Sequence, residues 1–191
     1  ALQLERAIET ELKDLNFAEV QFQIHFDKLA DYTADGVDDV EFLISMNPGQ
    51  PVKALAEVAS GGELSRTMLA IKTVMADRDE IETLIFDEID VGISGRTAQK
   101  VSEKMAVIGR NHQVICITHL AQIAAQADQH YLIEKTVDGG VTRTEIRKLS
   151  EEESIDELAR ILGGAEITET VRMSAREMKS MVKSNAVKNK K

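Results

Sequence analysis

The stretch TLIFDEID, from Thr83 to Asp90, decides how this chain is expected to fold. The run Thr83 to Phe86 does not alternate between apolar and polar residues, which is typical of a strand buried on both faces in a parallel sheet. Two adjacent carboxylates, Asp87 and Glu88, follow it directly. Ligands of open α/β sheets bind at the carboxyl ends of the strands, so this pair lies where a ligand would be held. One carboxylate could hold Mg²⁺ and the next could orient and deprotonate a water molecule. The alternative is an acidic loop after a strand, which is common.

A second strand of the same kind follows further along the chain, in the run VICIT from Val114 to Thr118. The segment between the two strands predicts a helix that Gly109 can cap, because its apolar residues recur at helical spacing. These residues are Ala98, Val101, Met105 and Ile108. Strand, helix and strand in this order form a crossover, which implies that the two strands are parallel.

Upstream, the stretch EVASGGELSRTMLAIK, from Glu57 to Lys72, places two glycines at the expected start of a helix. Ser60 followed by Glu63 predicts a capping box. An apolar stripe continues the helix beyond it, formed by Leu64, Met68, Ile71 and Met75. Gly61 and Gly62 then occupy the first turn, whose N–H groups have no helical partner and carry the positive end of the helix dipole. Without side chains in the way, an anion can approach these N–H groups. A loop that merely tolerates glycine is the alternative.

Two short segments complete the pattern. The sequence IDVGISG, with Asp90 and Gly92, predicts a tight loop that leads into the next helix. His119 follows the end of the second strand, on the edge where Asp87 and Glu88 are expected. A lone histidine at a strand end is usually structural, but at this edge it could donate to a phosphate oxygen.

The rest of the chain has simpler patterns. Residues 4–15 have the spacing of an amphipathic helix, and residues 20–26 and 40–46 alternate like two half-buried antiparallel strands around the turn DYTADGVDD. Residues 130–149 predict a hairpin that turns at Asp-Gly-Gly. A helix is expected from Ser150 to Gly163-Gly164, and Ser150 and Glu153 predict a capping box at its start. Another helix is expected over 168–182.

Composition limits the function classes. The 191 residues carry a formal net charge of -10, so nucleic acid is not expected to bind over a broad face. The single cysteine, Cys116, lies in an apolar run and is interpreted as a small buried residue in a reduced compartment. We find no membrane-spanning run and no signal peptide, so we expect a soluble, cytoplasmic protein. The chain starts without Met, which suggests a piece of something longer.

Together, the stretches EVASGGELSRTMLAIK, TLIFDEIDVGISG and VICITHLAQIAAQAD resemble the C-terminal half of an ABC-type ATPase head. In that order they are similar to its signature motif, its Walker B strand with D-loop, and its switch histidine. Transporters of this superfamily usually have Gln after the glycine pair and Asp-Glu-Pro after the strand. Glu63 and the sequence DEID instead resemble the DNA-repair and SMC branch. The resemblance is close from about Pro51 onward, and in the first fifty residues it concerns layout only.

The resemblance implies a fold: the C-terminal lobe of an ABC/SMC-type ATPase head, with parallel strands, flanking helices and small antiparallel strands. Residues 1–16 would be a coiled-coil exit helix and residues 17–191 the head lobe. It also implies site roles. The start of the signature helix would reach the γ-phosphate of an ATP held by a partner head, through Ser60, Gly61, Gly62 and Glu63.

For the other matching residues the resemblance implies the following roles. Asp87 would serve Mg²⁺, and Glu88 would position and activate the hydrolytic water. Asp90 and Gly92 would belong to the D-loop, which crosses the dimer interface. His119 would contact the γ-phosphate as the switch histidine.

An ATPase of this class also needs a P-loop, and the chain has no Gly-Lys pair. The resemblance implies that an N-terminal Walker A lobe of the same protein supplies it across a long coiled coil. Head pairing around ATP would then couple hydrolysis to DNA double-strand-break repair and recombination, away from any membrane. Two alternatives stay open: the nucleotide-binding lobe of an ABC transporter, and a non-catalytic docking module whose SGGE helix and acidic rim only pack against another chain.

Overall fold

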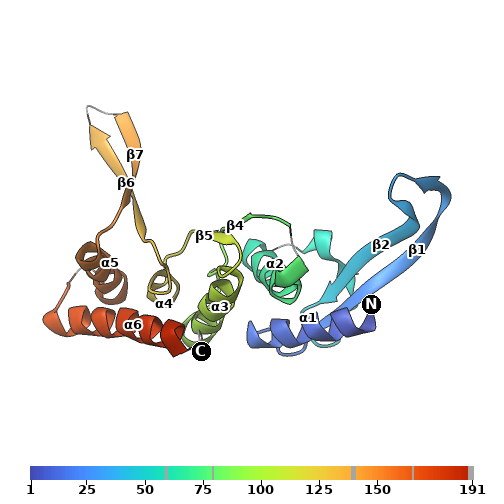
Figure 1. Cartoon of the computed structure of the whole chain (residues 1–191), viewed down its shortest axis with the longest axis horizontal. Helices are drawn as coiled ribbons and strands as arrows, with labels where there is room; N and C mark the ends of the chain where they lie inside the picture. Colours follow the sequence, from blue (N-terminus) through green and yellow to red (C-terminus); the bar gives the residue numbers. More distant parts are fainter. Residues whose placement is uncertain (59, 79, 139–140, 165, 189–191) are drawn as a thin grey trace. The chain divides into compact units, whose positions relative to one another are not determined.

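The computed structural model describes residues 1–58, 60–78, 80–138, 141–164 and 166–188 (Figure 1). The chain divides into two compact units, Ala1–Thr118 and His119–Lys191. Both combine helices with small sheets, as the sequence predicts. None of the helices in the described ranges is both long and apolar enough to cross a bilayer.

The first unit contains helices, an antiparallel sheet in the order β1-β2-β3 and a parallel pair formed by β4 and β5. In chain order its elements are α1 (Leu2–Asp14), β1 (Gln21–Thr33), β2 (Gly36–Ser45), β3 (Lys53–Ala54), the 3-10 helix η1 (Leu55–Glu57), α2 (Gly61–Met75), the 3-10 helix η2 (Ala76–Arg78), β4 (Thr83–Phe86), α3 (Gly95–Ile108) and β5 (Gln113–Cys116).

Helix α1 confirms the amphipathic helix predicted at the start of the chain. Its apolar residues Ile8 and Leu12 are fully buried. Its acidic face binds the edge of the antiparallel sheet, because Glu5 accepts a hydrogen bond from the N–H of Ile24 at 2.8 Å and Glu9 one from the N–H of Phe22 at 3.0 Å. Strand edges expose unpaired N–H groups, so these two carboxylates satisfy donors that would otherwise need water.

The predicted turn DYTADGVDD is wrong in extent, because β1 and β2 continue through most of it. The two strands pair antiparallel from Gln21↔Ser45 to Thr33↔Gly36, with an irregularity between Lys28 and Thr33. Only two residues, 34 and 35, lie outside the strands. A turn this tight needs an unusual backbone at its end, and Gly36 supplies it with φ +112.

The crossover β4–α3–β5 confirms the predicted parallel pair, with Thr83↔Gln113 through Phe86↔Cys116 in register. Helix α3 buries the predicted face, Ala98, Val101, Met105 and Ile108, and Gly109 is its C-cap. The prediction that both faces of the strands are buried is wrong. Leu84 and Phe86 point inward, but Ile85 is 67% exposed and its partner Ile115 is 43% exposed.

Of the apolar stripe predicted on α2, Ile71 is buried as expected, but the other three residues lie at the surface of this unit. Leu64, Met68 and Met75 are exposed at 36–38%, whereas the buried face of the helix contains Arg66, Thr67 and Leu69 to Ile71. Leu64 and Met68 line a pocket of ≈ 280 Å³ together with Leu84, Ile85 and Phe86 of β4. The outer faces of α2 and β4 therefore form one partly apolar surface.

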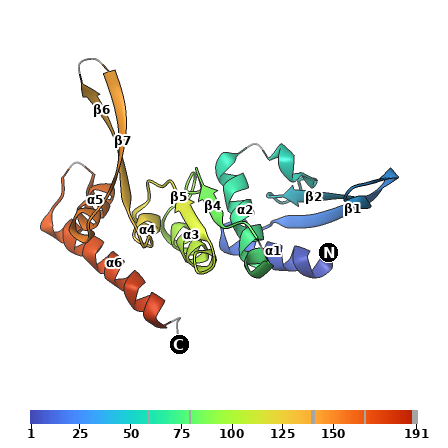
Figure 2. The ribbon, with the colours of Figure 1, turned by 45° about the horizontal axis from the view of Figure 1, so that its top comes forward.

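The second unit packs helices α5 and α6 against each other, with the hairpin β6–β7 joined to them (Figures 1 and 2). Its elements are α4 (Ala121–Ala124), β6 (Tyr131–Asp138), β7 (Val141–Lys148), α5 (Glu151–Gly163) and α6 (Glu169–Lys188). The core contains Ala121, Ala124, Ala125, Ile155, Leu158, Ala159 and Ala175. The predicted hairpin and the two predicted helices are confirmed, and Gly139 and Gly140 of the predicted turn lie outside the described residues.

The capping box at the start of α5 is present in both directions. Ser150 Oγ accepts from the N–H of Glu153 at 3.3 Å, and the Glu153 carboxylate accepts from the N–H of Ser150 at 2.8 Å. These bonds and Arg147 lower the pKa of Glu153 to about 2. Such a cap stabilises the start of the helix, because it satisfies two N–H groups that have no helical partner.

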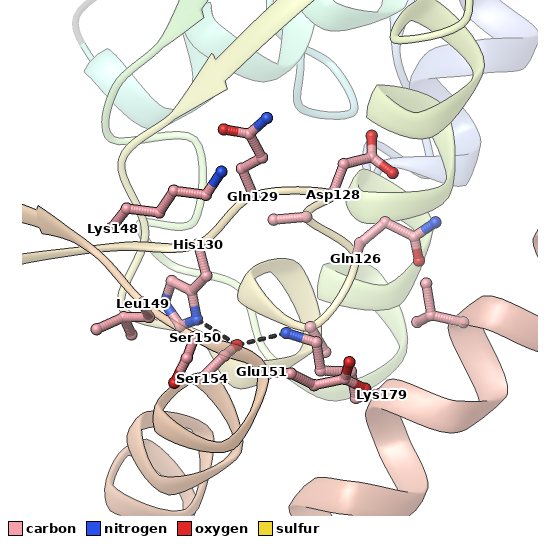
Figure 3. A pocket seen from close by; sticks show the side chains of 13 residues that line it. Gln126, Asp128, Gln129, His130, Lys148, Leu149, Ser150, Glu151, Ser154 and Lys179 are labelled. Atoms are coloured by element: carbon pink, nitrogen blue, oxygen red, sulfur yellow. Dashed lines mark hydrogen bonds between the residues drawn. The ribbon is translucent and has the colours of Figure 1, made fainter.

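Next to this cap, a pocket of ≈ 250 Å³ contains a polar cluster centred on Ser154, which is 1% exposed (Figure 3). Ser154 Oγ lies 2.9 Å from His130 Nδ1 and accepts from Lys179 Nζ. Burial and the Lys179 charge lower the pKa of His130, and Glu157 opposes them. Protonation would place two positive groups around one hydroxyl, so the folded unit favours neutral His130.

This cluster predicts that acid destabilises the second unit. The unfolded chain takes up a proton on His130 below about pH 6.5, while the folded unit does so only at lower pH. The free energy of unfolding of the unit should therefore be constant above about pH 7 and fall as the pH drops below about 6.5. The free energy of unfolding can be measured by urea unfolding at pH 7.5 and 5.5, with the amide exchange of α5 as the signal that reports on this unit. His130→Asn, which cannot titrate, should reduce the pH dependence, and an unchanged dependence would contradict the assignment.

Candidate functional site

The start of α2 is arranged as the sequence predicts. Gly61 is the first helical residue and Ser60 is the N-cap, with an extended backbone. Ser60 Oγ accepts from the N–H of Glu63 at 3.5 Å, so among the described hydrogen bonds the predicted capping box is formed in one direction only. Gly61 is exposed and Gly62 is buried. The first-turn N–H groups of a helix are the ones that bind anions, and Gly61 has no side chain of its own to cover its backbone donor.

Asp87 and Glu88 lie at the carboxyl end of β4, also as predicted, and both are exposed. Asp87 Oδ1 accepts a hydrogen bond from the N–H of Glu88 at 2.9 Å. Glu88 has φ 56, in the left-handed region that residues other than glycine rarely adopt. Strained backbone of this kind is concentrated at functional sites, where the surrounding structure holds it in place.

The structure brings the helix start and the carboxylate loop into contact within the first unit. A Cβ added to Gly61 would lie 2.2 Å from Glu88 Oε2. A Cβ added to Gly62 would lie 3.1 Å from the carbonyl oxygens of Glu88 and Val91. Gly62 is therefore tightly packed against backbone inside this unit, whereas Gly61 meets only the movable side chain of Glu88.

Two residues of α2 that the sequence analysis missed hold this loop. Ser65 Oγ donates to the carbonyl of Asp87 at 2.8 Å. Arg66, 7% exposed, donates through Nη1 to the carbonyls of Ile89 at 3.2 Å and Val91 at 2.8 Å. No signal in the sequence marks Arg66, because it lies between Ser65 and Thr67 and charged residues are usually exposed.

The environment of Arg66 explains how a guanidinium can be buried here. Its Cζ lies 5.4 Å from the centre of the Phe17 ring, within the range of a cation–π interaction. Burial lowers the pKa of Arg66 and the nearby Glu63 raises it. An arginine remains protonated under such conditions. The loop after β4 is therefore held by a fixed positive charge beneath it.

Asp90 is buried rather than exposed, at 3%. It accepts a hydrogen bond from Thr118 Oγ1 at 2.6 Å, which connects the loop after β4 to the segment after β5. Gly92 is exposed, with φ +76. The predicted roles of Asp90 and Gly92 at a dimer interface stay predictions. The nearby Cys116 is half-buried, and burial, with Asp90 and Asp87, raises the pKa of its thiol to about 12, so the thiol is chemically inert.

His119 follows Thr118 in the chain and is the first residue of the second unit. Its predicted contact with a γ-phosphate stays a prediction. Among the described residues there is no group of three or more His, Cys, Asp or Glu side chains that could enclose a metal ion. Asp87, the metal-binding candidate from the sequence, has an exposed carboxylate, and its role stays a prediction.

Comparison with solved structures defines the class of fold. The Smc head domain with a coiled coil and joint from Pyrococcus yayanosii matches with a TM-score of 0.55 and 24% sequence identity, over 81% of this chain and 28% of that chain. The Smc head domain from Pyrococcus furiosus, solved with the C-terminal domain of ScpA, matches with a TM-score of 0.54 and 23% identity, over 83% of this chain and 37% of that chain. The chain has the fold of a lobe of these Smc head domains.

Sequence comparison then identifies the relatives. The DNA repair protein RecN of Halalkalibacterium halodurans is 45% identical over 182 residues, which cover 93% of this chain and 32% of that protein. The chain is thus homologous, over nearly its whole length, to a segment of RecN. RecN of Treponema pallidum is 51% identical over 143 residues, covering 75% of this chain and 25% of that protein. The chain spans about a third or less of the length of these relatives, and no protein-family model matches it.

Proposed function

We propose that this chain is the C-terminal lobe of an SMC-like ATPase head, which binds and hydrolyses ATP together with an N-terminal Walker A lobe of the same protein. One observation carries the proposal: a glycine helix start and the carboxylate pair Asp87-Glu88 meet at the end of a parallel strand. The first feature suits a phosphate and the second suits a metal and a water molecule. The homology to RecN supports this combination.

The residues of this chain could supply part of a site for ATP and Mg²⁺, and the P-loop would come from the N-terminal lobe. Mg²⁺ is usually bound by one or two carboxylates together with phosphate oxygens and waters, so the single exposed carboxylate of Asp87 is sufficient on the protein side. Glu88, adjacent to it, would orient and deprotonate the attacking water. The start of α2, with Ser60, Gly61 and Gly62, would donate to the γ-phosphate of an ATP on a second head. His119 would donate to the γ-phosphate as well.

The exposed apolar surface of the first unit supports the proposal that a second lobe packs against it. A parallel sheet is normally covered on both faces, yet Ile85 and Ile115 are exposed on one face of β4 and β5, and Ile117 beyond them is 48% exposed. The apolar pocket between α2 and β4 continues this surface. We therefore place the N-terminal lobe against the outer face of β4 and β5.

The whole protein would act in DNA repair, as the name of its relatives, DNA repair protein RecN, suggests. We further propose that it acts in double-strand-break repair and recombination, in the cytoplasm and at the nucleoid, as the sequence resemblance implies. Pairing of two heads around ATP would be coupled to holding DNA. Arg147 of β7, one of the basic residues at the second unit's hairpin, is already paired with Glu153 at 2.7 Å. Any DNA contact there would fall to Arg143 and Lys148, which are exposed.

The two-lobe requirement gives a direct test. The isolated chain lacks the P-loop that cradles the phosphates, so its ATP turnover should be at background level. Co-expression with the N-terminal lobe, or use of the full-length protein, should restore turnover to about 1 s⁻¹ or more, the low end of the range typical of enzymes. Steady-state phosphate release measures the turnover of the isolated chain and that of the two lobes together. Turnover by the isolated chain at the rate of the full-length protein would contradict the proposed division of roles.

A further inference from the structure

We infer that the Glu88 carboxylate competes with a phosphate for the space outside Gly61 at the start of α2, so that a phosphate bound there must displace it. This inference deepens the proposed function and rests on it. It assigns Glu88 two alternating positions and makes the start of α2 the element that decides between them.

The first argument is steric. The atoms nearest to an ideal Cβ on Gly61 all belong to the Glu88 side chain: Oε2 at 2.2 Å, Cδ at 3.4 Å and Cβ at 4.0 Å. Real Cβ atoms essentially never lie within 3.0 Å of another heavy atom. The space outside Gly61 is therefore filled by the carboxyl group. A phosphate group is larger than a methyl group and cannot enter while Glu88 lies there.

The second argument is electrostatic. The N-terminus of a helix carries partial positive charge on N–H groups that lack helical acceptors, and it stabilises one nearby anion. A carboxylate at Gly61 uses the same field that would attract a phosphate. Two anions at this position would repel each other. Occupation by Glu88 and occupation by phosphate therefore exclude each other.

The third argument concerns what can move. Ser65 and Arg66 of α2 hold the carbonyls on either side of Glu88, those of Asp87 and Ile89. The N–H of Glu88 is bound by Asp87 Oδ1. With its backbone held, Glu88 can respond only by rotating its side chain. A phosphate that arrives at Gly61 from a second head would thus release the carboxylate that activates water in its own head.

The consequence is an order of events. Before the heads close, Glu88 rests against Gly61 and is turned away from the position at which it would activate the attacking water. When they close, phosphate binding at α2 and release of Glu88 are one event. Gly61 is then a positioning residue for Glu88 as well as a proposed phosphate ligand.

The experiment is a titration of the isolated, ¹⁵N-labelled chain with inorganic phosphate at pH 7.5, followed by the amide resonances of Gly61 and Gly62. Glu88→Ala should lower the apparent dissociation constant at these amides by about fivefold or more, the change expected when a unit charge about 4 Å away is removed in a water-like dielectric. The matched control is Glu57→Ala, which removes an exposed carboxylate three residues before Ser60. It should leave the constant as in the unaltered chain.

Equal constants for Glu88→Ala and the unaltered chain, or no phosphate binding by either, would overturn the inference. An equal improvement by Glu57→Ala would also overturn it, because the effect would then reflect net charge alone. Because alanine is strained at φ 56, Glu88→Gly is the second variant, and the dispersion of the same spectra shows whether each variant is folded. The titration involves no ATP turnover, so its failure leaves the ATPase proposal to be decided by the full-length protein.

Discussion

Replacing Glu88 with Gln in the full-length protein should lower ATP turnover by about 10²- to 10⁴-fold, the range that a positioned general base typically contributes. The amide has the shape of the carboxylate but cannot take a proton from water. Nucleotide binding should persist, because the proposed phosphate and metal contacts come from other residues. Head dimers should then accumulate in the presence of ATP. Phosphate release and size-exclusion chromatography with and without ATP measure the two effects.

The control for this prediction is Glu57→Gln, an exposed carboxylate with no role in the proposed chemistry. Its turnover should equal that of the unaltered protein. If Glu88→Gln hydrolyses ATP normally, Glu88 is not the base, and the docking-module interpretation, in which the acidic rim only packs against another chain, becomes the better account. If turnover falls and no dimers accumulate, the coupling between head pairing and ATP is contradicted.

The candidate site was largely predictable because it follows local rules. Asp87 and Glu88 directly follow the last residue of a strand in the sequence. They could therefore be placed at the carboxyl edge of the sheet from their position in the chain alone. The start of α2 was equally local, since Ser60 and the glycines define a helix N-terminus.

The contacts between these local elements could not be predicted. Nothing in the sequence indicates that Glu88 adopts φ 56 and turns its carboxylate onto Gly61, because that conformation depends on Ser65 and Arg66 holding the loop. The exposure of Ile85 was missed for a related reason. Periodicity reports that a residue is apolar, and it cannot report whether the surface that covers it belongs to the same chain segment.

Arg66→Ala should destabilise the first unit by about 2–4 kcal/mol, the second-largest effect expected here. The change removes a charged donor that serves the carbonyls of Ile89 and Val91, and the contact with the Phe17 ring. The two carbonyls would lose their partner in a place that water reaches poorly, which costs more than the bonds themselves contribute. Because the chain has two units, a single unfolding midpoint does not isolate the effect, and amide exchange of Leu69 and Ile71 in the core of the first unit is the appropriate measurement.

Arg66→Lys and Arg96→Ala make this prediction specific. Lysine keeps the charge but lacks the planar fork, so it should recover only part of the loss. Arg96, exposed at the start of α3, should change stability by no more than about 0.5 kcal/mol when replaced by Ala. In the full-length protein, Arg66→Ala should also lower turnover while nucleotide affinity changes little, because the loop that presents Glu88 loses its support. Normal stability together with normal turnover in Arg66→Ala would show that the loop after β4 holds its shape without the guanidinium, and that the Glu88 backbone is fixed by Ser65 and Asp87 alone.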